Sequence, residues 1–239
     1  MSSQPNQSLA DGLLCLQALA ASGESVGTRE LARELGLHHV KTNRMLMGLA
    51  EAGFAQRNEQ GRYTAGPALH VLAALATFRS GLLSAALPHL RELQRSTKAL
   101  VALGVRWRHE VCYLFHGSGS KPVEDALGRT ALHPATRSSI GLALLARADA
   151  NEVQSCYPGE IPGFSSLAAL TRELRAIRKQ NYAVCEHAPK GSPHLSIGVV
   201  LPAPIQAAIA VSGAATDCDI TAITEQLHAA AAAIAEGKP

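Results

Sequence analysis

Two short helical patterns joined by only three residues constrain this 239-residue chain more than any other feature. Thr28 is a suitable N-cap for the first helix, and Leu31 and Leu35 are spaced to share its buried face. The second helix is expected over 39–52. A short link that contains a glycine, here Gly36–His38, sets two helices at a steep angle. In a helix-turn-helix this geometry lets the second helix protrude and enter the major groove of DNA.

The second helix combines an apolar face with an outward polar face. Val40, Leu46 or Met47, and Leu49 or Ala50 are expected inside, whereas His39, Lys41, Thr42, Asn43 and Arg44 are expected outside. Asn43 and Arg44 could each make paired hydrogen bonds to a base edge. Lys41 and Thr42 could as easily hold phosphates, which position a protein on DNA without selecting a sequence. The alternative is a packing module whose polar residues form only a solvated face.

A hairpin is predicted directly after this helix. Strands over 54–58 and 62–64 flank the turn residues Glu59–Gly61, and Arg57 and Arg62 are suited to the DNA backbone or the minor groove. The formal charge of the whole chain is only +3, so the charge does not by itself indicate a nucleic-acid partner. The candidate DNA-contacting residues are Thr28, Arg29, His39, Lys41, Thr42, Asn43, Arg44, Arg57 and Arg62.

The remainder of the chain is typical of an α+β domain with an antiparallel sheet. A connecting helix is expected over 68–79. Further helices are expected at 83–96, 138–148, 167–180 and 219–235, and strands at 100–106, 111–116, 183–187, 195–201 and 207–213. With 47% hydrophobic and 17% charged residues, the chain has enough apolar side chains to bury cores.

Several features of the composition indicate a cytoplasmic protein without a membrane partner. The longest apolar runs are far shorter than the roughly 18 residues that suggest a membrane span. The first residues show no basic segment leading into an apolar one, as a secretory signal would. Five widely spaced cysteines without a Cys-x-x-Cys pair argue against a disulfide framework.

The order of short motifs along nearly the whole chain resembles that of the IclR family of transcriptional regulators. The motifs are Glu30–Ala32, Glu34–Leu37, Asn43–Leu46, Leu49–Gly53, Gly61–Gly66, Pro134–Ala146, Leu174–Tyr182 and Ala208–Gly213. Two departures lie on the predicted DNA-binding helix: Val40 replaces a serine that contacts phosphate in the family, and Asn43 replaces its usual histidine. The operator sequence therefore cannot be inferred from a relative.

The resemblance implies a winged helix-turn-helix over 1–66, a linker helix over 67–81 and a GAF-like effector-binding domain over 82–239. It also implies double-stranded operator DNA as a partner, a homodimer through the N-terminal units, and often a homotetramer through the effector domains. The effector of this family is a small organic acid, often aromatic. No cofactor is implied.

Carried over by position, the family's effector site corresponds to Ser138, Ser139, His194 and Ser212, with Glu186 near its entrance and Arg137 able to pair with a carboxylate. The two adjacent serines open a predicted helix, where free N–H groups favour an anion. Ala210 replaces a family serine, which favours a ligand with an apolar part. Other interpretations remain open: N-caps for the serines, an interface or a surface ion pair for Arg137, and a loop position for His194.

Two other classes of function have less support in the sequence. Catalysis is not expected, because no Walker loop, nucleophile elbow or complete Gly-x-Gly-x-x-Gly motif is present, and Gly117–Ser120 does not form such an elbow. A metal sensor is the alternative, since Cys185, His187, His194 and Cys218 are potential zinc ligands. Their spacing matches no known closed zinc motif.

Overall fold

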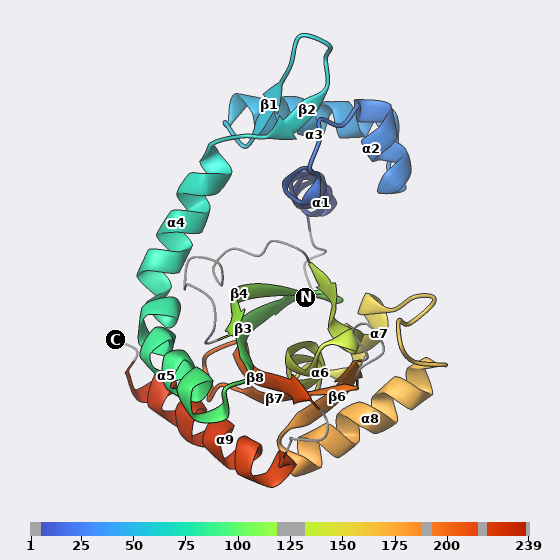
Figure 1. Ribbon diagram of the computed structural model, residues 1–239. Helices are drawn as coiled ribbons and strands as arrows, with labels where there is room; N and C mark the ends of the chain where they lie inside the picture. The colour runs from blue at the N-terminus through green and yellow to red at the C-terminus, as the bar shows by residue number, and fades with distance from the viewer. Residues whose placement is uncertain (1–5, 119–131, 188–192, 215–218, 238–239) are drawn as a thin grey trace, which may run out of the picture. The chain divides into compact units, whose positions relative to one another are not determined.

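The computed structural model describes residues 6–118, 132–187, 193–214 and 219–237. The chain divides into two compact units, Met1–Ser80 and Gly81–Pro239 (Figure 1). The first contains a helix-turn-helix with a hairpin, and the second an antiparallel sheet with helices on both faces. This arrangement confirms the predicted fold class.

The N-terminal unit folds around a small apolar core. Its elements are α1 (Gln7–Ala21), α2 (Thr28–Glu34), α3 (His39–Glu51), β1 (Ala55–Arg57), β2 (Tyr63–Ala65) and α4 (Ala68–Ser80). Cys15 and Leu19 of α1, Leu31 of α2, Leu46 of α3 and Tyr63 of β2 are almost completely buried in one cluster. The helices α1, α2 and α3 therefore each contribute one inward side, as the amphipathic patterns predict.

The turn between α2 and α3 depends on one glycine. Gly36 has a φ of +65°, a left-handed conformation that glycine adopts without steric cost. His38 is the N-cap of α3, and its Nδ1 accepts the N–H of Val40 at 3.4 Å. The predicted N-cap of α2 was wrong by one residue: Gly27 occupies the cap and Thr28 is the first helical residue.

The predicted orientation of two α3 residues was also wrong. Val40 is 52% exposed, whereas Thr42 is fully buried with its Oγ1 3.3 Å from the carbonyl oxygen of His38. Leu46 fixes the inward side of α3, and Thr42 lies one helical turn before Leu46 on that same side. Val40 lies two residues before Thr42 and consequently faces solvent, although it is the more apolar residue.

The C-terminal unit is built on one six-stranded antiparallel sheet. Its elements are α5 (Leu82–Thr97), β3 (Leu100–Trp107), β4 (Glu110–Ser118), β5 (His133–Pro134), the 3₁₀ helix η2 (Ala135–Arg137), α6 (Ser139–Leu145), α7 (Ala150–Cys156), α8 (Leu167–Gln180), β6 (Ala183–His187), β7 (His194–Val200), β8 (Ala207–Ala214) and α9 (Ile220–Glu236). The strand order is β5-β4-β3-β8-β7-β6.

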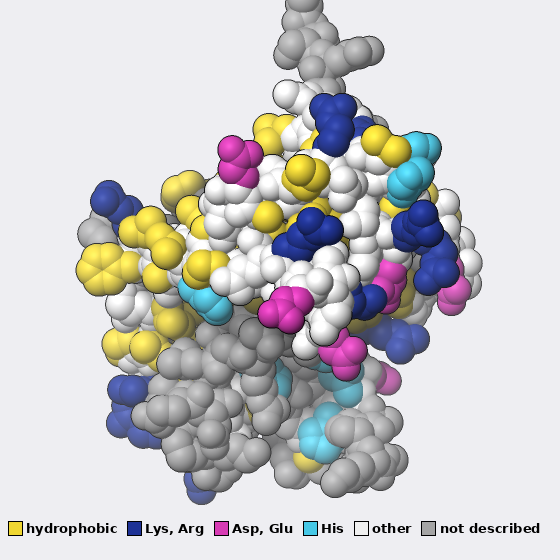
Figure 2. Space-filling model, turned by 90° about the horizontal axis from the view of Figure 1, so that it is seen from above, with side chains coloured by type: hydrophobic (Ala, Val, Ile, Leu, Met, Phe, Trp, Pro, Cys, Tyr) yellow, Lys and Arg dark blue, Asp and Glu magenta, His cyan; other side chains and the backbone are white. Residues whose placement is uncertain are grey.

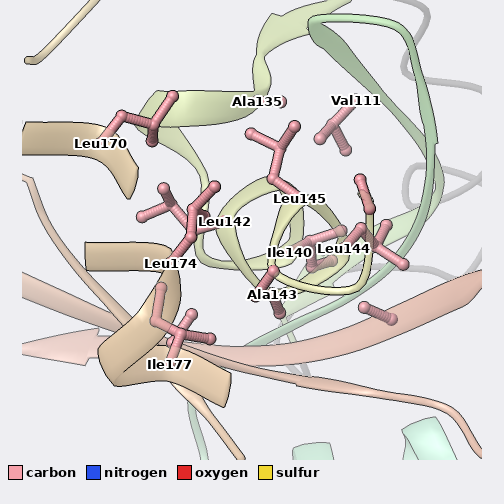
Figure 3. Close-up of a cluster of buried hydrophobic side chains, with 14 of the residues drawn as sticks. Val111, Ala135, Ile140, Leu142, Ala143, Leu144, Leu145, Leu170, Leu174 and Ile177 are labelled. Atoms are coloured by element: carbon pink, nitrogen blue, oxygen red, sulfur yellow. The ribbon is translucent and has the colours of Figure 1, made fainter. Parts of the chain in front are cut away.

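Apolar side chains cover both faces of this sheet. One face packs against α5 and α9, and the other curves around α6 (Figure 1). All seven residues of α6 are buried, and Figure 3 shows Leu170, Leu174 and Ile177 of α8 beside it. A helix apolar on every side needs cover on every side, which the sheet and α8 provide.

The segment predicted as one helix over 138–148 is shorter in the structure. Ser138 caps α6 by accepting the N–H of Gly141 at 3.3 Å, and α6 ends at Leu145. Asp149 then caps a separate helix, α7, by accepting the N–H of Glu152. The helix α6 therefore ends three residues before the predicted bound, and α7 is a separate helix that the sequence analysis did not predict.

Two glycines allow α6 to lie directly on its neighbours. A Cβ on Gly141 would lie 2.6 Å from the carbonyl carbon of Ala135, and one on Gly198 of β7 would lie 2.7 Å from the carbonyl carbon of Ser139. Both distances are shorter than real Cβ contacts. The start of α6 is therefore held against η2 and β7 by contacts between backbones.

Among the helices that the structure describes, none alone is long and apolar enough to cross a membrane, although α4 and α5 meet the length and composition criteria when taken as a bent pair.

Candidate DNA-binding and effector sites

The exposed side of α3 presents the side chains that direct contact with DNA bases requires. Asn43 and Arg44 are both exposed, as predicted, and Asn43 Nδ2 donates to the sulfur of Met47, at 3.5 Å. Val40 and Met47 are 52% and 57% exposed on the same helix. The outward surface of α3 therefore combines an amide, a guanidinium and two apolar side chains, whereas the inward side contributes Thr42 and Leu46 to the fold.

Lys41 is held by a carboxylate of the same unit. Its ammonium group forms an ion pair with Asp11 of α1, whose side chain is 3% exposed. Gln7 donates a second hydrogen bond to Asp11, at 2.7 Å. The hydrogen bonds from Lys41 and Gln7 lower the pKa of Asp11, so the carboxylate stays charged. Lys41 consequently ties α3 to α1, a role that the sequence analysis did not assign to it.

The two arginines of the hairpin have different surroundings. The guanidinium of Arg57 lies 5.8 Å from the centre of the Tyr63 ring, and Arg57 is exposed. Arg62 donates to the carbonyl oxygen of Ser25 at 3.0 and 2.6 Å, and its Nη2 lies 2.9 Å from Glu30. Arg62 thus fastens the hairpin to the start of α2, while Arg57 is available to a phosphate.

The remaining predicted DNA-contacting residues lie on the surface of the same unit. His39 and Arg29 are exposed and Thr28 is partly exposed. Figure 2 shows Lys and Arg side chains separated by hydrophobic, acidic and uncharged groups on this face, without a continuous basic patch. The distribution of charge alone therefore does not identify this surface as a DNA-binding surface.

A polar cluster lies where α6 begins, against an otherwise apolar sheet face. The Tyr113 hydroxyl and Ser138 Oγ are 2.9 Å apart, and Ser139 Oγ and Ser196 Oγ are 2.7 Å apart. Both α6 serines and Ser196 are buried. Ser212 of β8 is the register partner of Ser196 and, by strand alternation, shares its face. The structure thus brings together three predicted residues, Ser138, Ser139 and Ser212.

Imidazole groups border this cluster. The Tyr113 ring lies 5.0 Å from the His116 ring and 5.5 Å from the His133 ring, measured between centroids. His187 and the predicted residue His194 are register partners on β6 and β7. Burial lowers the pKa of His187, and the neighbouring His133 and His194 lower it further. His187 is therefore predominantly neutral at pH 7.

Cys185 and Glu186 point to opposite faces of β6. Cys185 packs against the α6 side with the polar cluster, whereas Val184 packs against the α5 and α9 side. Glu186 alternates with Cys185 and shares the face of Val184, and its position near the site entrance stays a prediction. Burial, followed by the charge of Glu186, raises the pKa of the Cys185 thiol to about 11, while Arg137 opposes this shift. Arg137 itself is exposed on η2.

The residues considered as metal ligands form no metal centre within the part of the chain that the structure describes, where no group of three or more His, Cys, Asp or Glu residues could hold an ion. Cys218 lies outside the described residues.

Sequence reasoning missed Tyr113, His116, His133 and Ser196, which the fold adds to the polar cluster. Tyr113 and Ser196 occupy alternate positions in apolar strands, on the same face as Val111 and Gly198 respectively. The alternation of side chains along a strand could have assigned Tyr113 and Ser196 to a face of the sheet. Which side chains they meet there depends on the register of the sheet, which the sequence does not show.

Family models match both units of the chain. The model described as the IclR helix-turn-helix domain matches residues 8–59. The model described as the C-terminal part of the bacterial transcriptional regulator IclR matches residues 74–236. A comparison with curated proteins gave no match.

Solved structures share this fold. An IclR family transcriptional regulator from Brucella abortus superimposes with a TM-score of 0.75 at 21% identity, covering 99% of this chain and 94% of that one. An IclR-type regulator from Alicyclobacillus acidocaldarius gives a TM-score of 0.69 at 20% identity, with 99% and 100% covered. An IclR homologue from Microbacterium hydrocarbonoxydans, complexed with 4-hydroxybenzoate, gives 0.66 at 21% identity, with 96% and 98% covered.

Proposed function

Because the chain belongs to the IclR family of bacterial transcriptional regulators, we propose that it binds a two-fold symmetric operator through α3 and that a small organic acid controls this binding. The exposure of Asn43 and Arg44 on the outward side of α3 is the observation that carries the first part. Neither side chain is needed for the apolar core beneath it, so both are free to contact base edges.

The DNA contacts fall into two groups. Asn43 and Arg44 contact base edges, with the apolar Val40 and Met47 beside them on α3. His39, Arg29, Thr28 and Arg57 contact phosphates at the edges of this surface. Lys41 and Arg62 position α3 and the hairpin through their ion pairs and contribute to DNA binding indirectly.

The variant Arg44→Ala tests the DNA-binding proposal. Operators are first selected from a randomised DNA pool with the wild-type protein, and binding of each variant to the selected sequence is then measured. A lost bidentate base contact costs about 1–3 kcal/mol, or roughly a 5- to 150-fold loss of affinity. Arg91→Ala, which removes an exposed arginine from α5, is the matched control. Unchanged binding by Arg44→Ala, or no enriched sequence in the selection, would contradict the proposal.

The effector is proposed to bind beside Ser138, Ser139 and Ser212, with its carboxylate near Arg137 or His194. The polar cluster within an apolar sheet face supports a ligand that has both a polar and an apolar part. The Microbacterium homologue was solved with 4-hydroxybenzoate, a molecule of this class. Aromatic acids are therefore the first compounds to test.

A thermal-shift screen of benzoate, 4-hydroxybenzoate and short aliphatic acids tests this part, because a ligand that binds only the folded state raises its melting temperature. Ser212→Ala is expected to reduce the shift and to leave DNA binding intact. A full shift in Ser212→Ala would place the ligand elsewhere.

We propose that the active form is a homo-oligomer. The helix α4 has no buried residue, and its Val71, Leu72, Leu75 and Phe78 are 49–88% exposed. Large apolar side chains gathered on one helix favour association with another copy. Effector binding would then alter the spacing of the two α3 helices through α4. Light scattering should give at least a dimer, and Phe78→Glu should lower the mass; a monomeric wild-type protein would contradict this part.

A further inference from the structure

A second potential site lies at the opposite end of α6 and β7 from the polar cluster. A cavity of about 880 Å³ opens there, between the end of α6, the end of α8 and the loop from β7 to β8. Its volume falls within the range of about 300–1,000 Å³ that is typical of small-molecule sites. The polar cluster and this cavity share no lining residue, because they lie at the two ends of the same buried helix.

The lining of this cavity combines an apolar floor with a polar wall. Leu144, Val200 and Ile205 contribute aliphatic surface, and Gln180 and Asn181 contribute amides. The loop that closes one side contains Pro202 and Pro204, whose rings restrict the backbone. A wall with little conformational freedom loses little entropy when a ligand binds.

The charges at the cavity are not balanced. Arg106 forms an ion pair with Glu152, and Arg106 is only 13% exposed in its side chain. Glu152 is the single acidic residue in the lining, so this pair uses the only carboxylate that lines the cavity. Arg147 is exposed, and its guanidinium makes no hydrogen bond or ion pair with any residue in the described ranges. One positive charge therefore faces the cavity without a counter-charge.

We propose that this cavity is a second small-molecule site, which takes an organic anion with an apolar body and binds the anionic group through Arg147. A guanidinium presents a planar set of donors that matches carboxylate, sulfonate or phosphate groups. The aliphatic floor would cover the apolar body while the amides of Gln180 and Asn181 hydrogen-bond to polar atoms. This proposal is independent of the effector site and of DNA binding.

The probe for this site is 8-anilinonaphthalene-1-sulfonate, an aromatic sulfonate whose fluorescence rises in apolar surroundings. It is titrated into the full-length protein, and binding is followed by energy transfer from Trp107, the only tryptophan of the chain and the neighbour of the lining residue Arg106. The variant Arg147→Gln is expected to weaken binding about tenfold or more, since a charge-assisted hydrogen bond is lost. Arg175→Gln, which changes an exposed arginine of α8 outside the lining, should bind as the wild type does.

Two further variants fix the position of the probe. Ala203→Phe places a large side chain on the loop at the cavity without adding a second tryptophan and should reduce binding, whereas Ser212→Ala at the polar cluster should leave binding unchanged. The proposal is overturned if the wild-type protein gives no energy transfer to the probe, or if Arg147→Gln and Ala203→Phe bind normally. A loss of equal size in Arg175→Gln or Ser212→Ala would overturn it as well.

Discussion

Replacing Gly141 with alanine has two opposing effects on the stability of the protein, and both act through α6. Alanine has the higher helix propensity, and from that term alone the substitution would stabilise the protein by ~1 kcal/mol. The added Cβ, however, would lie 2.6 Å from the carbonyl carbon of Ala135, and both residues are buried. Because the opposing atoms belong to backbone, no side-chain rotation relieves the overlap.

The contact is expected to outweigh the propensity. Overpacking of a rigid core costs up to ~3 kcal/mol, and the propensity offsets ~1 kcal/mol of this. The expected net loss is ~2 kcal/mol, which lowers the melting temperature by ~4–8 °C in a unit of this size. The displaced helix start would also weaken the hydrogen bond between Ser139 and Ser196, so effector binding should fall with stability.

Circular dichroism during heating measures this effect. The matched control is Gly159→Ala, because a Cβ at Gly159 meets no atom within 4 Å. The control should melt within about 2 °C of the wild type, since a surface substitution without such a contact changes stability by only ~0.5 kcal/mol. If Gly141→Ala melts at or above the wild-type temperature, α6 is not held against η2 by direct backbone contact.

Two further predictions follow from the buried and titrating groups. Thr42→Val should keep operator affinity within about twofold and lower the free energy of unfolding by ~1 kcal/mol, because the lost hydrogen bond to His38 is internal. Gel-shift and melting experiments measure the two quantities. A loss of DNA binding without a loss of stability would show that Thr42 contacts DNA. The pKa of His187 is lower in the folded state than in the unfolded chain, so the folded state binds a proton at this residue less readily. The free energy of unfolding is therefore highest above the unfolded pKa of ~6.5, and it decreases as the pH falls from there through the folded pKa. Urea unfolding between pH 7.5 and 5 should show this loss in the wild type and less of it in His187→Gln; identical pH profiles would refute the assignment.

Strongly periodic segments could be predicted from the sequence almost to the residue. The helix expected over 167–180 and the strand expected over 183–187 have those bounds in the structure, because α8 carries a clear apolar stripe and Asn181 ends it in a left-handed conformation. The helix expected over 138–148 was less well predicted. There all residues of α6 are buried, so no apolar stripe marks its ends, and Ser138 and Asp149 cap the two separate helices.

The site was less predictable because it depends on distant pairs. Ser138 and Ser139 could be singled out in the sequence, but Tyr113 and Ser196 are joined to them only by the sheet register. On α3, hydrophobicity suggested an inward Val40, whereas the position of Leu46 in the helix placed Thr42 there. Residue type and position along the helix predicted different inward residues here, and the position relative to the larger buried side chain, Leu46, determined which residue is buried.

The ion pair between Asp11 and Lys41 has a consequence for how salt affects operator binding. Each phosphate that a protein neutralises releases condensed counterions and adds about 0.9 to the slope of log affinity against log salt concentration. Lys41 and Arg44 are the two cations of α3, and Lys41 is already neutralised inside its own unit. The operator complex should therefore weaken less steeply with added salt than the count of lysines and arginines suggests, so that more of its free energy comes from base contacts that salt leaves intact.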